Sequence, residues 1–206
     1  DGSDATNFLG NTYKYSYIDN WKNFYNTGVT TNTSVAISGS DKDITYRLGV
    51  YYNKEKSILP NAGTQQLGFN TNTTYKIFNN LSAIVTANYT EDKSNGRSNL
   101  SDGNGNTNAS LLYRGNSFDV RWLKGTSAGW GTNADGSEMI AGNNVYFNNP
   151  YWLQYRKTNN MNRNRLTGSL TMKWDITSWL YLQGAVQRDG YNIEFRQVQP
   201  KGAAAD

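Results

Sequence analysis

Cysteine and histidine are both absent from the 206 residues of this chain. Without them no disulfide framework and no cysteine-based zinc site can form. Neither a Cys–His nor a Ser–His–Asp catalytic group can be built from this chain alone. The carboxylates are few and dispersed, so no hydrolase pair stands out. We therefore expect a protein that is not an enzyme and that binds no metal or other cofactor.

Long hydrophobic runs are missing as well. The mean hydropathy is -0.75, and no stretch approaches the ~20 apolar residues that a membrane-spanning helix needs. This argues against membrane helices but not against barrel strands, in which lipid-facing and lumen-facing residues alternate and the average is polar. Positive charge is in mild excess, at +4 with a pI near 9.1. The lysines and arginines form no run, so the sequence predicts no nucleic-acid partner.

Alternation of apolar and polar residues is the dominant pattern that is present. Aromatic residues make up 14% of the chain, and apolar positions recur at every second residue over long stretches. This pattern predicts strands near residues 29–39, 43–54, 65–78, 81–92, 161–175 and 179–191. The four clearest run for about 12 to 15 residues, whereas strands of globular proteins cluster near about 5–6. Membrane-spanning strands need about 9–11.

Each clear strand has one uncharged side. In residues 43–54, for example, Ile44, Leu48 and Val50 alternate with Thr45 and Arg47. We predict that the uncharged side faces lipid and that the other side lines a wet lumen. The basic residues predicted to face that lumen are Arg47, Lys76, Arg165 and Lys173.

The connections between these strands alternate in length. Residues 40–42, 79–80 and 176–178 form short connections, whereas 55–64 and above all 93–160 form long ones. Outer-membrane barrels have short periplasmic turns and long extracellular loops in this order. We therefore predict an all-β fold, an antiparallel up-and-down transmembrane β-barrel to which this chain contributes about six strands, with 93–160 as an extracellular loop.

The aromatic residues agree with this orientation. Tyr75, Trp174 and Trp179 lie beside the short turns, and Tyr52 lies at the far end of its strand. Aromatic girdles at both membrane interfaces have this placement. The alternative is that these are ordinary sheet aromatics, which favour strands in any protein.

The long connection 93–160 is the one candidate for a functional site, because connections of this length are uncommon unless they are functional or disordered. Its aromatic residues are candidates for stacking on a sugar ring or closing over a substrate, in particular Trp122, Trp130, Tyr151 and Trp152. The alternative is that they pack the loop on itself or against a partner subunit.

Several segments resemble, in order and spacing, the SusC/RagA-like family of TonB-dependent outer-membrane transporters. They are Asn20-Trp21 with residues 24–28, then 35–39, 46–52, Asn149-Pro150-Tyr151-Trp152, 162–165 and 170–179. The similarity covers residues 15–60 and 145–205 well and the middle loosely. The resemblance implies one segment of a barrel of about 22 strands in the bacterial outer membrane, with the plug domain outside this chain.

The same resemblance implies the partners. A SusD-like surface lipoprotein would close the mouth and hand over a glycan or an oligopeptide, and TonB would act through parts outside this chain. Two alternatives stay open at this point. One is a secreted, soluble all-β carbohydrate-binding module. The other, a small complete outer-membrane barrel, is disfavoured because single-chain barrels start at about eight strands.

Overall fold

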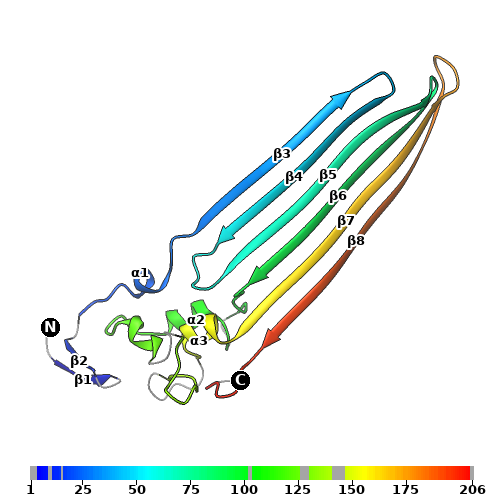
Figure 1. Ribbon diagram of the computed structural model, residues 1–206. Coiled ribbons are helices and arrows are strands. Elements are labelled where there is room, and N and C mark those ends of the chain that lie inside the picture. Colours follow the sequence, from blue (N-terminus) through cyan, green and yellow to red (C-terminus); the bar gives the residue numbers. More distant parts are fainter. Residues whose placement is uncertain are drawn as a thin grey trace.

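Six long strands form one antiparallel sheet in which each strand pairs with the next along the chain (Figure 1). The computed structural model describes residues 4–8, 11–14, 16–101, 104–125, 130–140 and 147–204. The strands are β3 (Val29–Ser40), β4 (Ile44–Lys56), β5 (Gly63–Phe78), β6 (Leu81–Asn95), β7 (Thr158–Asp175) and β8 (Tyr181–Val198). The predicted all-β, up-and-down antiparallel sheet is confirmed. Within the described residues the sheet is open, because β3 and β8 each pair on one side only.

The strands are longer than the sequence pattern predicts. They contain 12 to 18 residues, and the largest difference is at the end of β8, which extends to Val198 and pairs with the start of β7. There Asn159 pairs with Gln197 and Asn160 pairs with Arg196. These residues show no alternation of apolar and polar side chains, so the sequence does not predict a strand there. The backbone hydrogen bonds to the neighbouring strand extend the sheet through them.

The connections between the strands lie at the two opposite ends of the sheet (Figure 1). The turns 41–43, 79–80 and 176–180 lie at one end, and the connections 57–62 and 96–157 lie at the other. Only 96–157 is long, because β4 and β5 extend into the predicted connection 55–64 and leave 57–62 between them. The first turn is closed by a hydrogen bond from Asp41 N to Ile44 O (2.7 Å) and the last by one from Ile176 N to Leu180 O (2.9 Å). The sheet therefore has a turn end and a loop end.

Short elements that the alternation pattern did not predict gather at the loop end. They are the hairpin of β1 (Asp4–Phe8) and β2 (Asn11–Lys14), then α1 (Asn20–Phe24), α2 (Thr107–Leu112), the 3-10 helix η1 (Val120–Lys124) and α3 (Pro150–Tyr155). We call α1, α2, η1 and α3 together the loop unit. No helix among the described residues is both long enough and apolar enough to cross a membrane.

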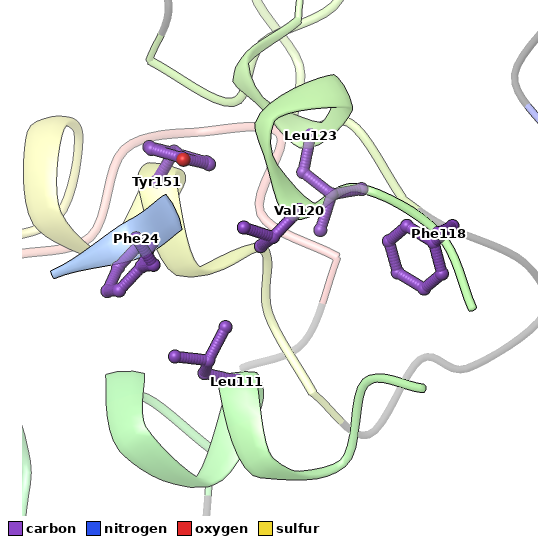
Figure 2. Packing of buried hydrophobic residues seen from close by; sticks show 6 residues of the cluster. All are labelled: Phe24, Leu111, Phe118, Val120, Leu123 and Tyr151. Carbon is purple, nitrogen blue, oxygen red and sulfur yellow. The ribbon is translucent and has the colours of Figure 1, made fainter. Parts of the chain in front are cut away.

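Apolar side chains far apart in the sequence form the core of the loop unit. Figure 2 shows them converging between the helices. The buried members are Phe24, Leu111, Phe118, Val120, Leu123 and Tyr151. Helices of five or six residues are not stable alone, so this shared core is what keeps them folded.

Side-chain caps fix where three of these helices begin. The Asn106 side chain accepts from Ala109 N (3.1 Å), Asp119 accepts from Arg121 N (2.9 Å) and Asn149 accepts from Tyr151 N (2.9 Å). Each cap satisfies a backbone donor that the first helical turn leaves without a partner. Asn149 is followed by Pro150, whose fixed φ suits the first helical position.

Truncating a core leucine of α2 tests how far the loop unit depends on its core. Leu111 is 3% exposed and its neighbour Leu112 is 64% exposed. We expect Leu111→Ala to lower the free energy of unfolding of the loop unit by about 2–5 kcal/mol, because it removes buried methyl groups and leaves a cavity. Leu112→Ala should change it by less than about 0.5 kcal/mol.

The measurement is hydrogen exchange of the purified protein. Faster exchange is expected in peptides from α1, α2, η1 and α3, with β4 to β7 unchanged. Equal protection in the two variants would show that the cluster does not hold the loop unit together.

Candidate functional site

The register of the sheet sorts its side chains onto two faces. Residues that stand opposite each other in neighbouring strands point to the same face. One such row runs across four strands, from Arg47 on β4 through Asn72 and Thr86 to Ser169 on β7. By this register the face of Arg47 carries most of the Thr, Ser, Asn and Gln of the sheet. It also carries all four basic residues singled out from the sequence, which are Arg47, Lys76, Arg165 and Lys173. We call this the polar face.

The opposite face carries an uncharged band. From β3 to β7 every pairing row between that of Ile44 and that of Val50 lacks a charged residue on this face. Its side chains have little protein cover: Val35 is 70% exposed and Leu166 is 50% exposed. A continuous exposed apolar surface of this kind marks contact with another apolar phase or partner. We call this surface the apolar band.

The predicted interface aromatics lie on or beside this band. Tyr75 stands opposite Ile44, Trp174 stands opposite Leu81, and Tyr52 stands opposite Leu67. Trp179 lies in the last short turn and is 80% exposed. Three of the four are thus near the turn end, and Tyr52 is at the loop-end edge of the band.

The loop-end edge of the band runs obliquely across the strands. On β4 the last apolar residue of the band is Tyr52, whose pairing row reaches β6 at Glu91. On β6 the last apolar residue is Tyr89, two residues nearer the turn end than that row. On β8 the last apolar residue of the band is Val186, opposite Leu170. It lies four residues nearer the turn end than the row of Tyr89, which reaches β8 at Gly190. An oblique edge is what a flat apolar layer produces on strands that are tilted as in a barrel wall.

Hydrogen bonds link four side chains across the polar face near the loop end. Asn53, Gln66, Asp92 and Arg163 stand in one pairing row of β4 to β7. Asn53 Nδ2 donates to Gln66 Oε1 (2.9 Å), and Gln66 Nε2 donates to Asp92 Oδ1 (2.7 Å). The Arg163 guanidinium donates twice to Asp92 Oδ2 (2.9 and 2.6 Å). We call this row the polar ladder; each member fixes the orientation of the next.

The polar ladder forms one wall of a groove of about 430 Å³. Ser94, Arg97 and Met161 line the same groove. The Arg97 guanidinium donates to Met161 Sδ at 3.4 Å, and no carboxylate among the described residues pairs with it. The groove therefore presents fixed hydrogen-bonding groups, the Arg97 cation and the Glu55 carboxylate.

The next row toward the turn end is also ordered. The Tyr51 hydroxyl is 3.2 Å from Thr90 Oγ1, and its ring lies against Gly68, where a Cβ would be 2.0 Å from Tyr51 Cζ. Arg165 pairs with Asp189 at 2.6 Å, with both side chains about half exposed. An exposed pair of this kind contributes little to stability, so its main effect is on the charge pattern of the face.

The loop unit is attached directly to the strand ends. Asn61 Nδ2, in the connection between β4 and β5, donates to Gln154 O of α3 (2.8 Å). With its side-chain amide in the orientation that satisfies all partners, Gln154 donates to Pro60 O (2.9 Å) and to Gly96 O (3.3 Å), and accepts from Thr107 Oγ1 (2.5 Å). The loop unit thus lies over the end of the sheet where the polar ladder ends.

The structure places the four loop aromatics differently from one another. Trp152 is 0% exposed and Tyr151 is 3% exposed, so both pack inside the loop unit and do not present a surface to a substrate. Burial also raises the pKa of the Tyr151 hydroxyl above its usual range. Trp122 is half-buried and meets Tyr13 edge-on, with ring centroids 5.2 Å apart. Only Trp130 exposes much of its ring, at 40%.

Trp130 is held by an arginine. The Arg156 guanidinium lies 5.9 Å from the Trp130 ring centroid and 5.6 Å from that of Trp152. This cation–π contact orients the exposed ring. Of the four predicted residues, Trp130 is the one that remains a candidate for contact with cargo.

A buried carboxylate that the sequence did not single out holds the loop unit to the end of the chain. Glu138 is 2% exposed and accepts hydrogen bonds from Asn148 Nδ2 (2.8 Å), Ala204 N (2.7 Å) and Asn149 N. Its own backbone N–H donates to Gly202 O (2.8 Å). An isolated Glu in a loop carries no sequence signal for such a role. Nearby, hydrogen bonds from Arg121 hold the pKa of the Asp119 carboxyl below its usual range, so that this helix cap stays ionised.

An antiparallel, up-and-down sheet with one polar and one uncovered apolar face has the construction of a β-barrel wall. The fold is similar to a solved structure of the RagAB peptide importer in the "closed-closed" state, with a TM-score of 0.61 and 13% sequence identity. The match covers 86% of this chain and 19% of that chain. This chain therefore corresponds to about a fifth of that protein. At this identity the likeness establishes the fold and not the cargo.

Comparisons by sequence add nothing to this. No protein-family model matches the chain, and no curated protein matches it.

Removing the cation of the polar ladder tests whether the row is a coupled unit. The Asp92 side chain is 15% exposed. Arg163→Met leaves this carboxylate without its strongest partner, so we expect a loss of about 1–3 kcal/mol in the free energy of unfolding. The double variant Asp92→Asn/Arg163→Met should recover most of that loss, because no uncompensated charge remains.

The measurement is a double-mutant cycle from denaturant unfolding of the full-length protein in detergent. Arg47→Met is the matched control. Arg47 lies on the same face, and no carboxylate among the described residues pairs with it, so the expected change is under about 0.5 kcal/mol. An equal effect of Arg163→Met and Arg47→Met would show that the ladder is not energetically coupled.

Proposed function

We propose that this chain is part of the barrel wall of an outer-membrane transporter for nutrients. The observation that carries the proposal is the apolar band, which is wide, uncharged and uncovered while the other face of the same strands is polar. In a soluble sheet the apolar face is buried by a second layer. Here the described residues supply no such layer. The strands contain 12 to 18 residues, which is more than the about 9–11 residues that a strand needs to cross a bilayer.

In this arrangement the two faces have separate roles. The apolar band contacts the hydrocarbon of the outer membrane, and the polar face lines the lumen. The short turns lie on the periplasmic side, and the loop unit lies at the extracellular mouth. Arg47, Lys76, Arg165 and Lys173 then line the lumen, with Tyr52, Tyr75, Trp174 and Trp179 at the membrane interfaces.

The partners follow from the resemblance to SusC/RagA-like transporters and from the fold match. A SusD-like lipoprotein would cover the mouth above the loop unit, and TonB would act on a plug domain contributed by another part of the protein. The match to a peptide importer supports oligopeptides over glycans as cargo. The groove at the polar ladder, with fixed amides, a paired carboxylate and the cation of Arg97, offers groups that a peptide backbone and its termini can bind.

A charge placed on either face tests the membrane assignment. Leu170 and Thr171 are neighbours on β7 that point to opposite faces. Leu170→Arg puts a cation into hydrocarbon, at a cost of about 2–4 kcal/mol near the bilayer centre, and should reduce the amount of folded protein in the outer membrane several-fold. Thr171→Arg points into water and should assemble normally.

The measurement is the amount of heat-modifiable, protease-resistant protein in isolated outer membranes. If both variants assemble equally well, the band does not face lipid. A secreted carbohydrate-binding module, the alternative open at the sequence level, would in addition be released from cells without detergent.

Uptake measurements test the cargo. A strain lacking the full-length gene should lose import of labelled oligopeptides and keep import of oligosaccharides, and the wild-type gene should restore the loss. The opposite pattern would assign glycans as cargo and leave the role in the barrel wall intact.

A further inference from the structure

The outward surface just beyond the apolar band is unusually rich in asparagine. On β7 the positions that continue the face of Leu166 toward the loop end are Asn164, Asn162 and Asn160, and on β8 Asn192 stands opposite Asn164. Asparagine is a poor strand former, so propensity does not explain a strip of such residues. Each amide offers both donors and an acceptor, and the strip begins directly where the apolar side chains end.

Two adjoining hollows follow this strip. The first, of about 370 Å³, is lined by Tyr89 and Leu166 at the edge of the band and by Asn164, Arg188 and Asn192. The second, of about 310 Å³, lies farther toward the loop end and is lined by Lys93, Asn160, Asn162 and Arg196, with Glu194 also at its wall. The two hollows share no lining residue, but Asn164 of the first and Asn162 of the second are successive positions on the same face of β7, so together they run from apolar side chains to amides and cations. We call the two hollows together the outer groove.

Arg188 shows which way the groove is oriented. It is the first charged residue on the outward face of β8 and lies in the pairing row of Gly168. Its Nε lies 3.9 Å from the position that a Cβ on Gly190 would take, so the side chain runs along β8 away from the apolar band. A cation at the edge of a bilayer extends in this way to reach the headgroup layer.

The charge on this surface is positive. Beyond the band the outward face of β4 to β8 carries Lys54, Lys56, Lys93, Arg188 and Arg196 against Glu91 and Glu194. Glu91 pairs with Lys93 at 2.6 Å. Among the described residues no carboxylate pairs with Arg188 or Arg196. Arg188 and Arg196 are therefore the two cations of the outer groove that have no paired carboxylate among the described residues.

The height of the outer groove indicates which kind of lipid headgroup can fill it. From Leu166 to Asn160 the strand rises by about 20 Å, or roughly 14 Å in height at the usual tilt of about 45°. The headgroup layer of a bilayer adds only about 5–8 Å on each side of the hydrocarbon. A simple phospholipid headgroup is too short to fill the groove, whereas a headgroup built from phosphorylated sugars is long enough.

We propose that the outer groove binds a phosphorylated glycolipid of the outer leaflet. Its acyl chains lie on the apolar band beside Tyr89 and Leu166, and its sugar hydroxyls bind the asparagine strip. Its phosphates bind Arg188 and Arg196, and Lys93 exchanges its partner Glu91 for a phosphate. This rests on the proposed function, because it needs the band to face lipid with the loop end outward. It adds a lipid site on the outside of the wall, separate from any cargo site in the lumen.

The test uses the purified full-length protein in detergent and native mass spectrometry, with bisphosphorylated lipid A and its dephosphorylated form as probes. Lys93→Gln/Arg196→Gln should weaken binding of the phosphorylated probe by about tenfold or more, since charge-assisted contacts to phosphate are lost. The control Arg47→Gln/Lys76→Gln removes the same two residue types from the polar face and should bind as the wild type does. The exchange Lys93→Arg/Arg196→Lys keeps the charge and should retain most of the binding.

Two results would overturn the proposal: equal binding by the two glutamine doubles, or equal binding of the two probes by the wild type. The assembly assay with Leu170→Arg separates this outcome from failure of the proposed function. A wall that assembles in the membrane but binds both probes equally contradicts only the glycolipid site.

Discussion

The register of backbone hydrogen bonds between neighbouring strands is the constraint on which both faces of the sheet depend. The pairing runs from Val29 opposite Lys56 to Thr158 opposite Val198, and within the six-stranded sheet it shifts only between Lys76 and Phe78. Because side chains alternate strictly, a slip of one residue in any strand would move its apolar set to the polar face. The two faces exist only as long as every register is kept.

The register also explains why polar groups can be arranged with precision on so flat a surface. The polar ladder forms because four strands place Asn53, Gln66, Asp92 and Arg163 in one row, at the spacing of neighbouring strands, about 4.8 Å. The same rule places the asparagines of β7 beside Arg188 and Arg196 on the other face. The two faces of such a sheet contact two different environments. Because successive side chains of a strand alternate between the faces, the residues on each face can differ independently of those on the other.

The loop end follows a different principle. Its helices are too short to be stable alone, and their apolar core is small, so buried polar groups contribute much of the specificity. Asn20 donates to Phe118 O (2.9 Å) and accepts from Val120 N (2.9 Å), and Glu138 ties α3 to the segment after β8. Removing one partner from such a buried network leaves the others unsatisfied, which costs more than the bond itself contributes. The loop unit is therefore held by its small apolar core together with these buried hydrogen bonds.

The sequence by itself determined the strands and their two faces, because alternation is a local property that can be read from consecutive residues. It placed Arg47, Lys76, Arg165 and Lys173 on one face, and it anticipated both the order of the strands and the end of the sheet at which each connection lies. Only the tertiary structure decided what the long connection does. The sequence left open whether Tyr151 and Trp152 face a substrate or pack the loop on itself, and the structure buries both. Glu138 looks unremarkable in the sequence but joins three segments. Contacts of this kind link residues that are 10 to 66 positions apart, and no periodic pattern records them, because each depends on where the folded chain brings the other partner.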